Sequence, residues 1–269
     1  MPLIAVNGAR LHVEDTGGPG PVVAFSHGLL WSGTMFEAQI QALKASYRCV
    51  SWDHRGQGRS DVPPDRAVSI EQTYDDAVAL LDALKIEQVH FVGLSMGGFV
   101  GMRLAARQPQ RVASLCLMAS AADPEPRENI GKYKTLCVVT RLFGVGAVAS
   151  RVLPIMFSQS FLRDPSLAAE RQRWEAELRK NGRGVVKAVY GVIEREGCAE
   201  LLPQIQCPTL LLSGAEDVAI VPARMDALQR ALPRASLVRI PRAGHTLCVE
   251  NPAPVTEALR SFLADHART

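Results

Sequence analysis

A serine flanked by glycines marks the point where the chain is predicted to turn most sharply. Positions 93–97 read G-L-S-M-G, a G-x-S-x-G spacing that follows an apolar run. In a strand-to-helix turn of this kind the serine backbone is strained, and the residues two positions away must lack side chains. Such strain usually accompanies function. We therefore interpret Ser95 as a nucleophile, with tight packing at a corner as the alternative.

Two other kinds of glycine-rich turn fit this segment poorly. A dinucleotide-binding turn of the form G-x-G-x-x-G would need glycine at positions 93, 95 and 98, but position 95 is serine. A Walker A phosphate loop would need Gly-Lys followed by Ser or Thr, and the sequence does not continue in that way after Gly98. Nucleotide binding at this turn is therefore disfavoured.

A serine hydroxyl becomes a good nucleophile only with partners. A histidine must take its proton, and a buried carboxylate must fix the tautomer of that histidine. Asp217 follows the strand expected at residues 209–214, and His245 lies in a Gly-His turn after the last expected strand. The N–H of Met96, at the start of the helix after the serine, would point at the developing oxyanion. Ser95, Asp217 and His245 are the predicted catalytic residues, in the chain order of a nucleophile elbow.

Strand-like runs alternate with helical segments along most of the chain. Strands are expected near residues 11–14, 22–26, 48–53, 89–93, 112–118, 209–214 and 237–240. This alternation is typical of a mostly parallel sheet covered by helices on both faces. Two helix starts are specific. Ser69 with Gln72 has the capping-box spacing, and Asn251 with Pro252 supplies an N-cap and a first-turn proline.

The alternation stops between residues 121 and 203, where helix-type sequence continues without a good strand. We interpret this stretch as a helical cap inserted into the sheet domain, with Pro124, Pro126 and Pro203 near its ends. The predicted domains are therefore a core of residues 1–120 and 204–269, and a cap of residues 121–203. The cap holds thirteen Lys and Arg against ten Asp and Glu, so the whole net charge of +3 lies there.

Further motifs in the same order resemble the α/β-hydrolase family. Besides the serine turn and the two partners at strand ends, His27-Gly28-Leu29 resembles the family's H-G-x loop, and residues 53–60 resemble its D-x-R-G-x-G-x-S loop. The resemblance covers nearly the whole chain apart from the cap. It implies an eight-stranded, mostly parallel sheet flanked by helices. It also implies that the N–H of Leu29 is the second oxyanion donor, beside that of Met96.

The resemblance also separates the acid from its neighbour and implies a mechanism. The family's G-x-x-D spacing from Gly214 favours Asp217 over Glu216 as the acid. Ser95 would form an acyl-enzyme, and His245 would act as base and then as acid, so that no cofactor is needed. Because the nucleophile is a serine and not an aspartate, the dehalogenase and epoxide-hydrolase branches of the family are disfavoured.

The remaining residues of these motifs are expected to have structural roles. His27 is interpreted as a hydrogen-bonding residue of the oxyanion loop. Asp53 and Arg55 are expected to brace their loop through an ion pair or hydrogen bonds. Four more histidines are expected to have no catalytic part: His12, His54, His90 and His266.

The residues of these motifs are most similar to those of the enol-lactonase, carboxylesterase and cofactor-free haloperoxidase-like (perhydrolase) group. We expect a small or medium hydrophobic ester or lactone as the substrate, in contact with Leu29, Trp31 and Met96. The apolar stretch at residues 136–157 suggests an apolar channel. Ordinary packing of the cap on the core is the commoner reason for such a stretch, and a weak interfacial surface is a third explanation. The positive charge of the cap slightly favours anionic substrates.

The totals exclude several classes of protein. A net charge of +3 over 269 residues, with no basic block that contains aromatics, disfavours nucleic acid as a partner. The six scattered cysteines form no C-x-x-C pair and read as reduced core residues, so no metal site is expected. Residues 1–7 lack the features of a signal peptide, and no apolar stretch reaches membrane-spanning length. We expect a cytoplasmic protein, whose oligomeric state the sequence does not indicate.

The leading hypothesis is a serine hydrolase that cleaves a carboxylic ester or lactone. One alternative is a ligand receptor built on the same fold, in which the triad survives but turnover is slow. Another is perhydrolysis, in which peroxide intercepts the acyl-enzyme. These alternatives share the three catalytic positions, so the motifs alone leave them open.

Overall fold

A computed structural model describes residues 3–266. Residues 1, 2 and 267–269 lie outside the described residues. The predictions for residues 1–7 and for the core of residues 1–120 and 204–269 include these positions. No helix in the described part of the chain combines the length and the apolar composition that crossing a membrane requires.

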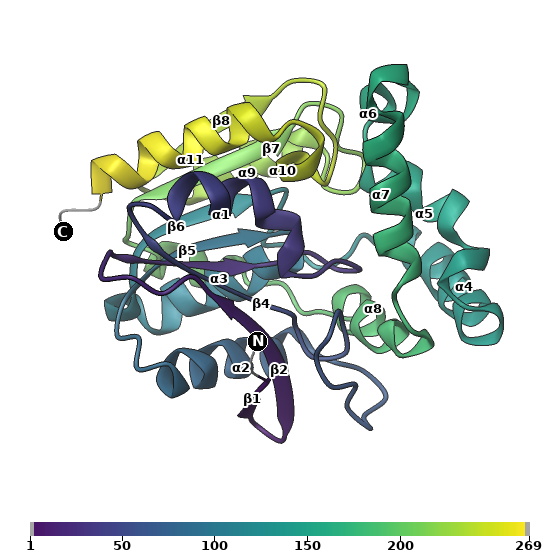
Figure 1. The fold of residues 1–269 in the computed structure, drawn as a ribbon, viewed down its shortest axis with the longest axis horizontal. Coiled ribbons are helices and arrows are strands. Elements are labelled where there is room, and N and C mark those ends of the chain that lie inside the picture. Colours follow the sequence, from purple (N-terminus) through teal and green to yellow (C-terminus); the bar gives the residue numbers. More distant parts are fainter. Residues whose placement is uncertain (1–2, 267–269) are drawn as a thin grey trace.

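An eight-stranded sheet forms the centre of the molecule (Figure 1). Its spatial order is β1-β2-β4-β3-β5-β6-β7-β8. β1 and β2 pair antiparallel, as do β2 and β4, and every later pair is parallel. The mostly parallel sheet predicted from the sequence is therefore confirmed. The strands are β1 (Leu3–Val6), β2 (Ala9–Asp15), β3 (Val22–Ser26), β4 (Arg48–Trp52), β5 (Val89–Leu94), β6 (Val112–Met118), β7 (Thr209–Gly214) and β8 (Ala235–Ile240).

The central strands are apolar because helices cover both faces of the sheet. All six residues of β5 are buried, and so are all six of β7. Parallel strands of this kind read as continuous apolar runs, which is why the sequence located them to within one or two residues. In contrast, β8 pairs with β7 alone and alternates between partly exposed and exposed side chains along most of its length.

The sequence reading missed the first strand. β1 is four residues long and pairs only with β2, through a hairpin whose turn is Asn7-Gly8. Both turn residues have positive φ, 45° and 75°. An Asn-Gly pair between short apolar runs is a strong hairpin signal, because this turn requires positive φ at both positions. The signal was present in the sequence, although the strand that precedes it is very short.

Helices α1 and α11 pack on one face of the sheet, and α2, α3 and α9 pack on the other. Each face of the sheet has its own apolar core. α2 begins at the predicted capping box, in which Ser69 and Gln72 bond each other's backbone, and α11 begins at Pro252 as predicted. The α-helices are α1 (Glu37–Leu43), α2 (Ile70–Ala83), α3 (Met96–Arg107), α4 (Arg127–Phe143), α5 (Ala149–Met156), α6 (Gln159–Arg163), α7 (Ala168–Arg179), α8 (Val186–Ile193), α9 (Pro222–Ala231), α10 (Leu247–Glu250) and α11 (Pro252–His266).

Residues 121–203, all of them described, contain helices and no strand, and we call them the helical insertion. Figure 1 shows α4 to α7 together at one side of the molecule, beyond the sheet. The apolar stretch at residues 136–157 contributes both to the core on the α1 and α11 side and to a cavity described below. Whether the insertion behaves as a separate domain remains a prediction.

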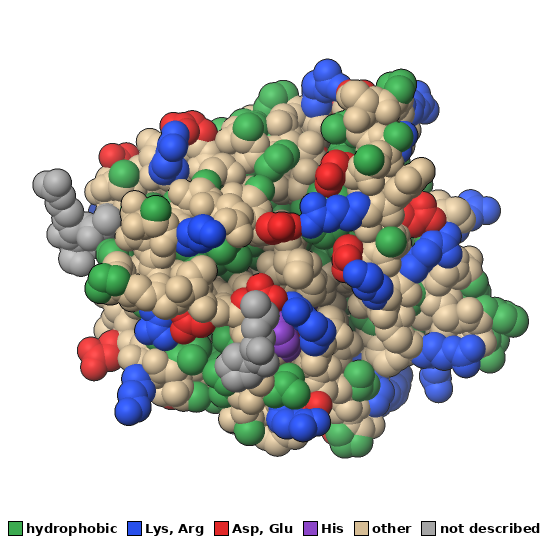
Figure 2. Space-filling model, in the orientation of Figure 1, with side chains coloured by type: hydrophobic (Ala, Val, Ile, Leu, Met, Phe, Trp, Pro, Cys, Tyr) green, Lys and Arg blue, Asp and Glu red, His purple; other side chains and the backbone are tan. Residues whose placement is uncertain are grey.

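Several charged side chains on the helical insertion form ion pairs. On the face shown in Figure 2, Lys and Arg side chains gather over these helices, with Asp and Glu side chains among some of them. Along α7, for example, Arg179 pairs with Glu175 at 2.7 Å, and Lys180 pairs with Glu177. The six cysteines are all unpaired, as predicted, and five of them are buried. Within residues 3–266 no group of three His, Cys, Asp or Glu side chains could hold a metal ion.

Candidate active site

Ser95 stands at a strained turn between β5 and α3. Its backbone has φ 51° and ψ −109°, values that an L-residue rarely adopts. Its N–H donates to the carbonyl of Met118 on the neighbouring strand at 2.8 Å, and its carbonyl accepts from Phe99 N–H in α3 at 3.0 Å. These bonds hold the residue between a strand and a helix. They account for a strained conformation that persists in the folded protein.

The two glycines of the turn are required by close backbone contacts. A Cβ atom on Gly93 would lie 2.4 Å from the carbonyl oxygen of Gly97. A Cβ atom on Gly97 would lie 1.9 Å from the carbonyl oxygen of Ser26 in β3. Neither backbone oxygen can move away without disturbing α3 or the sheet. The G-x-S-x-G spacing is therefore a steric requirement of this turn.

Asp217 and His245 come together at the ends of β7 and β8. The Nδ1 of His245 lies 3.0 Å from Oδ2 of Asp217, and both side chains are buried. Because a carboxylate can only accept, Nδ1 carries the proton and Nε2 keeps a free lone pair. The other carboxylate oxygen accepts from the N–H groups of Ala219 and Ile220 at 2.8 and 2.9 Å. Glu216 points elsewhere and accepts from the backbone N–H of Ser160 at 3.0 Å.

The surroundings of His245 favour its protonated form despite burial. Burial is the largest single influence and acts to lower the pKa of the imidazole. The negative charge of Asp217 and its hydrogen bond act in the opposite direction, with smaller contributions from Glu250 and Glu125. Together these groups raise the pKa of His245 above its ordinary value of 6.5. The side chain is therefore a stronger base than a histidine in water.

A second buried carboxyl group, Glu250, fixes the loop that carries the histidine. Its oxygens accept from the backbone N–H groups of Gly244 at 3.0 Å, Thr246 at 3.1 Å and Ser158 at 2.7 Å. Burial raises the pKa of Glu250, and these hydrogen bonds act to lower it. Ser158 belongs to the helical insertion. Glu250 therefore ties the start of α6 to the loop of the histidine.

The predicted oxyanion donors are the backbone N–H groups of Met96, next to Ser95 in the chain, and of Leu29, which lines the same cavity as Ser95. Met96 is the first residue of α3, so its N–H has no partner inside the helix. Within residues 3–266 the N–H of Leu29 has no hydrogen-bond partner. The loop of Leu29 is held from both sides, since His27 Nδ1 donates to Gly28 O at 2.7 Å and Leu30 N–H donates to Gln57 Oε1 at 2.7 Å. The two predicted oxyanion donors thus belong to well-held backbone.

The remaining predicted structural residues hold the loops that follow β3 and β4. His27 accepts at Nε2 from the N–H of His54 at 2.8 Å, and burial lowers the pKa of His27. Asp53 accepts from the N–H of Gly33 at 2.9 Å. Arg55 forms a buried ion pair with Asp76 at 2.5 Å. These contacts confirm that Asp53 and Arg55 brace their surroundings through hydrogen bonds and an ion pair.

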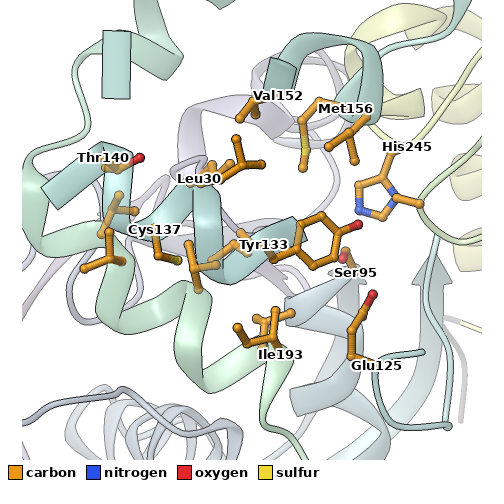
Figure 3. Close-up of a pocket in the computed structure, with 18 of the residues that line it drawn as sticks. Leu30, Ser95, Glu125, Tyr133, Cys137, Thr140, Val152, Met156, Ile193 and His245 are labelled. Carbon is orange, nitrogen blue, oxygen red and sulfur yellow. The ribbon is translucent and has the colours of Figure 1, made fainter. Parts of the chain in front are cut away.

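Ser95 and His245 line one cavity between the sheet and the helical insertion (Figure 3). Among the described residues no hydrogen bond joins the serine hydroxyl to the imidazole, and such bonds often become short only when substrate binds. The cavity has a volume of about 110 Å³. An engineered cavity of roughly 150 Å³ accepts benzene. The wall is mostly apolar, with side chains that include Leu29, Phe99, Leu136, Val148, Val152, Ile155, Met156, Val189, Ile193 and Ile220.

The structure does not bring all the predicted substrate contacts to this cavity. Leu29 lines it, but Trp31 and the side chain of Met96 do not. Trp31 packs edge-on against Phe157 and Trp174 and faces a neighbouring, more polar cavity. The thioether of Met96 is buried against the amide of Gln57. Trp31 is turned toward side chains of the helical insertion, whereas Met96 is turned toward a loop of the core, so the two side chains leave the cavity wall for different reasons.

Three polar residues of the cavity wall were not predicted from the sequence. Glu125, Tyr133 and Arg195 all lie in the helical insertion and line the cavity. They belong to no recognisable motif, and they are separated by up to seventy residues. Only the fold of the insertion brings them together. Glu250 was also missed, although its spacing five residues after the Gly-His turn could have drawn notice.

Chemically, the site contains a hydroxyl group on a strained turn, a basic imidazole held by a carboxylate, and two backbone donors. Such a set fits nucleophilic attack on a carbonyl group with stabilisation of the resulting oxyanion. A site that is mostly apolar strengthens these electrostatic interactions, because it excludes water.

Known proteins share this fold over nearly their whole length. The profile of a family described as alpha/beta hydrolase fold matches residues 21–252. A protein from Caulobacter sp. (strain K31), named a carbamate hydrolase, RutD, is 31% identical over 96% of this chain and 97% of its own.

Two solved structures are also similar. An esterase from Thermogutta terrifontis is 32% identical and superposes with a TM-score of 0.89, covering 99% of this chain and 97% of its own. An enol-lactonase from Burkholderia xenovorans LB400 is 31% identical, with a TM-score of 0.89 and coverage of 98% and 100%.

Proposed function

The chain belongs to the α/β-hydrolase fold family, and from that premise we propose that it is a serine hydrolase of carboxylic esters or lactones. Ser95 attacks the substrate carbonyl while His245 takes the hydroxyl proton and then gives it to the leaving oxygen. Asp217 holds the imidazole in the required tautomer. The N–H groups of Leu29 and Met96 stabilise the oxyanion, and water then releases the acyl group from the serine.

One observation carries this proposal. The hydrogen bond between Asp217 and His245 leaves Nε2 of the imidazole basic, and that imidazole lines the same cavity as a serine on a strained turn. A serine that only filled a corner would need neither a shared cavity nor a histidine with a raised pKa. The similarity to an esterase and an enol-lactonase supports esters and lactones as the substrate class.

We further propose that residues 121–203 act as a cap that selects the substrate. Most of the apolar side chains around the cavity come from this segment, whereas Ser95 and His245 come from the sheet loops. The cavity volume of about 110 Å³ favours a short acyl group or a small lactone. The acyl preference is therefore expected to change with substitutions in the insertion.

Hydrolysis of p-nitrophenyl butanoate and of a panel of small lactones tests the proposal. The wild-type protein is compared with Ser95→Ala, which removes the nucleophile and leaves the turn and the helix start unchanged. We expect the rate to fall by about 10⁴-fold or more. The melting temperature of each variant serves as the folding control. Equal rates in the two proteins would exclude Ser95 as the nucleophile.

A carbamate is a second candidate substrate, favoured by the name of the Caulobacter relative. The same serine would attack the carbamate carbonyl, so the catalytic residues do not separate the two classes. Phenyl N-methylcarbamate and phenyl propanoate differ only in an N–H in place of a CH₂ group beside the carbonyl. A higher kcat/KM on the carbamate, after correction for the uncatalysed rates, would favour the second candidate.

A further inference from the structure

One charged pair on the cavity wall has no part in the proposed reaction. Glu125 and Arg195 are the only Asp, Glu, Lys or Arg side chains among the described residues that line the cavity of Ser95. Arg195 Nη1 donates to Glu125 Oε2 at 2.9 Å, and the two side chains are 9% or less exposed. Desolvation largely offsets the attraction within a buried pair, so such a pair is weak evidence for stability alone.

Arg195 is held by the protein and is not free to bind a ligand. Its Nη1 and Nη2 also donate to backbone carbonyls at 2.8 and 3.2 Å, and its guanidinium lies 4.3 Å from the centre of the Phe99 ring. Its Nε is fully enclosed and has no partner in the described part of the chain. Asn129 Nδ2 donates to the other oxygen of Glu125 at 3.0 Å. The arginine and the asparagine therefore fix the carboxylate in one position.

The fixed carboxylate faces the catalytic groups. Figure 3 shows the carboxyl end of Glu125 directed toward Ser95 and the hydroxyl of Tyr133 directed toward His245. Burial, with the charge of Glu125 as a further cause, raises the pKa of Tyr133 to about 12. The charge of Glu125 also contributes to the raised pKa of His245. Within residues 3–266 the Tyr133 hydroxyl has no hydrogen-bond partner.

A carboxylate in this position selects for a hydrogen-bond donor. Each carboxylate oxygen can accept more than one hydrogen bond, and Arg195 and Asn129 occupy only one position on each. A ligand that enters the cavity, excludes water and leaves the remaining acceptor positions of this buried carboxylate without a donor is penalised. An N–H or O–H group of the substrate satisfies that requirement, whereas a methyl group of the same size does not.

We propose that the substrate carries a hydroxyl or N–H group on the atom next to its reacting carbonyl carbon, and that Glu125 accepts the hydrogen bond from this group. The inference rests on the proposed function, because it takes Ser95 as the nucleophile. The unpartnered Tyr133 hydroxyl lies beside the same position and completes a small polar patch. The rest of the cavity takes a short apolar acyl chain.

Two matched substrates test whether a hydrogen-bond donor next to the carbonyl is selected. Ethyl 2-hydroxybutanoate and ethyl 2-methylbutanoate differ only in a hydroxyl or methyl group next to the carbonyl. In the wild-type protein we expect kcat/KM to be about tenfold to a hundredfold higher for the hydroxy ester, the range of one hydrogen bond to a charged acceptor. In Glu125→Gln the ratio should fall to within about threefold of one, because the amide lacks the charge.

Glu128→Gln provides the matched control. Glu128 is exposed, lies three residues further along and does not line the cavity. This variant should keep the wild-type ratio, because it removes the same charge from the neighbouring surface. An unchanged ratio in Glu125→Gln, or no preference in the wild-type protein, would overturn the inference. Failure of the proposed function would show differently, as equal turnover of p-nitrophenyl butanoate by wild type and Ser95→Ala.

A second variant guards against misfolding, since Glu125→Gln leaves Arg195 buried without a carboxylate. Combining Glu125→Leu with Arg195→Met replaces the pair with apolar side chains of similar volume, a change that proteins often tolerate. The hydroxy-ester preference should be lost here too, and its retention would contradict the inference. The pair of phenyl N-methylcarbamate and phenyl propanoate then tells whether an N–H donor is selected as well as a hydroxyl.

Discussion

The two sides of the cavity are built in different ways. On the sheet side, backbone contacts fix each group: the turn of Ser95 is held by the neighbouring strand, and the loop of His245 is held by Glu250. On the side of the helical insertion, apolar side chains from separate helices form most of the wall, and Glu125 and Arg195 are its charged side chains. The difference suggests that the sheet side determines the reaction and the insertion determines the substrate.

The two sides also differ in what a mutation can change. A group held by several backbone hydrogen bonds cannot shift to accommodate a new neighbour, so substitutions there should affect every substrate alike. A wall of packed side chains can be reshaped locally. Substitutions there should change the relative rates of different substrates more than the rate itself.

The largest expected effect is on the sheet side. Asp217→Asn should lower kcat by about 10²-fold to 10⁴-fold on all substrates, because the imidazole loses the carboxylate that fixes its tautomer. The measurement is steady-state hydrolysis of p-nitrophenyl butanoate and a small lactone. Glu216→Gln is the matched control, since Glu216 accepts from Ser160 and not from the histidine; it should change kcat less than about threefold. A comparable loss in both variants would refute the assignment of the acid.

The second prediction compares the stability effects of two glycine substitutions, one on the sheet side of the cavity and one in the helical insertion. Gly97→Ala should destabilise the protein by about 2 kcal/mol or more, because its methyl group would clash with the backbone of Ser26. Gly131→Ala, in an open position on α4, should stabilise by about 0.5–1 kcal/mol. Urea unfolding of both variants measures the difference. A tolerated Gly97→Ala would mean that the turn is looser than described.

A third prediction concerns the wall of the insertion. Ile155→Ala enlarges the cavity and should raise kcat/KM for p-nitrophenyl hexanoate relative to butanoate by about tenfold, the effect of one or two methylene groups in an apolar pocket. Val138→Ala, at a position on α4 that is 52% exposed, should leave the ratio unchanged. If the ratio did not respond to Ile155→Ala, the acyl chain would have to lie elsewhere.

The smallest effect is a shift of the pH profile. As the pH falls through the raised pKa of His245, the imidazole becomes protonated and kcat/KM declines. Removing the charge of Asp217 removes a group that raises this pKa, so the acid limb of Asp217→Asn should move to lower pH. The pH dependence of kcat/KM in both proteins gives the direction. A shift to higher pH would contradict the role given to the carboxylate.

The sequence was informative where the fold imposes a backbone requirement. Gly93 and Gly97 have no room for a side chain, and the buried parallel strands must be apolar, so both left clear patterns. The short strand β1 was missed because four residues give little periodicity. The substrate side of the cavity was not predictable from residue spacing. Glu125 and Arg195 meet only because the insertion folds back on itself, and the packing of Trp31 on Trp174 of the insertion was not predictable either.

Covalent labelling with a fluorophosphonate tests the central claim most directly, because such reagents react with a serine that a histidine activates. The account predicts one adduct per chain, found by mass spectrometry on the peptide that contains Ser95. Labelling should be much slower in Asp217→Asn and absent in Ser95→Ala. An active wild-type protein that took up no label, or took it up at another residue, would contradict the account.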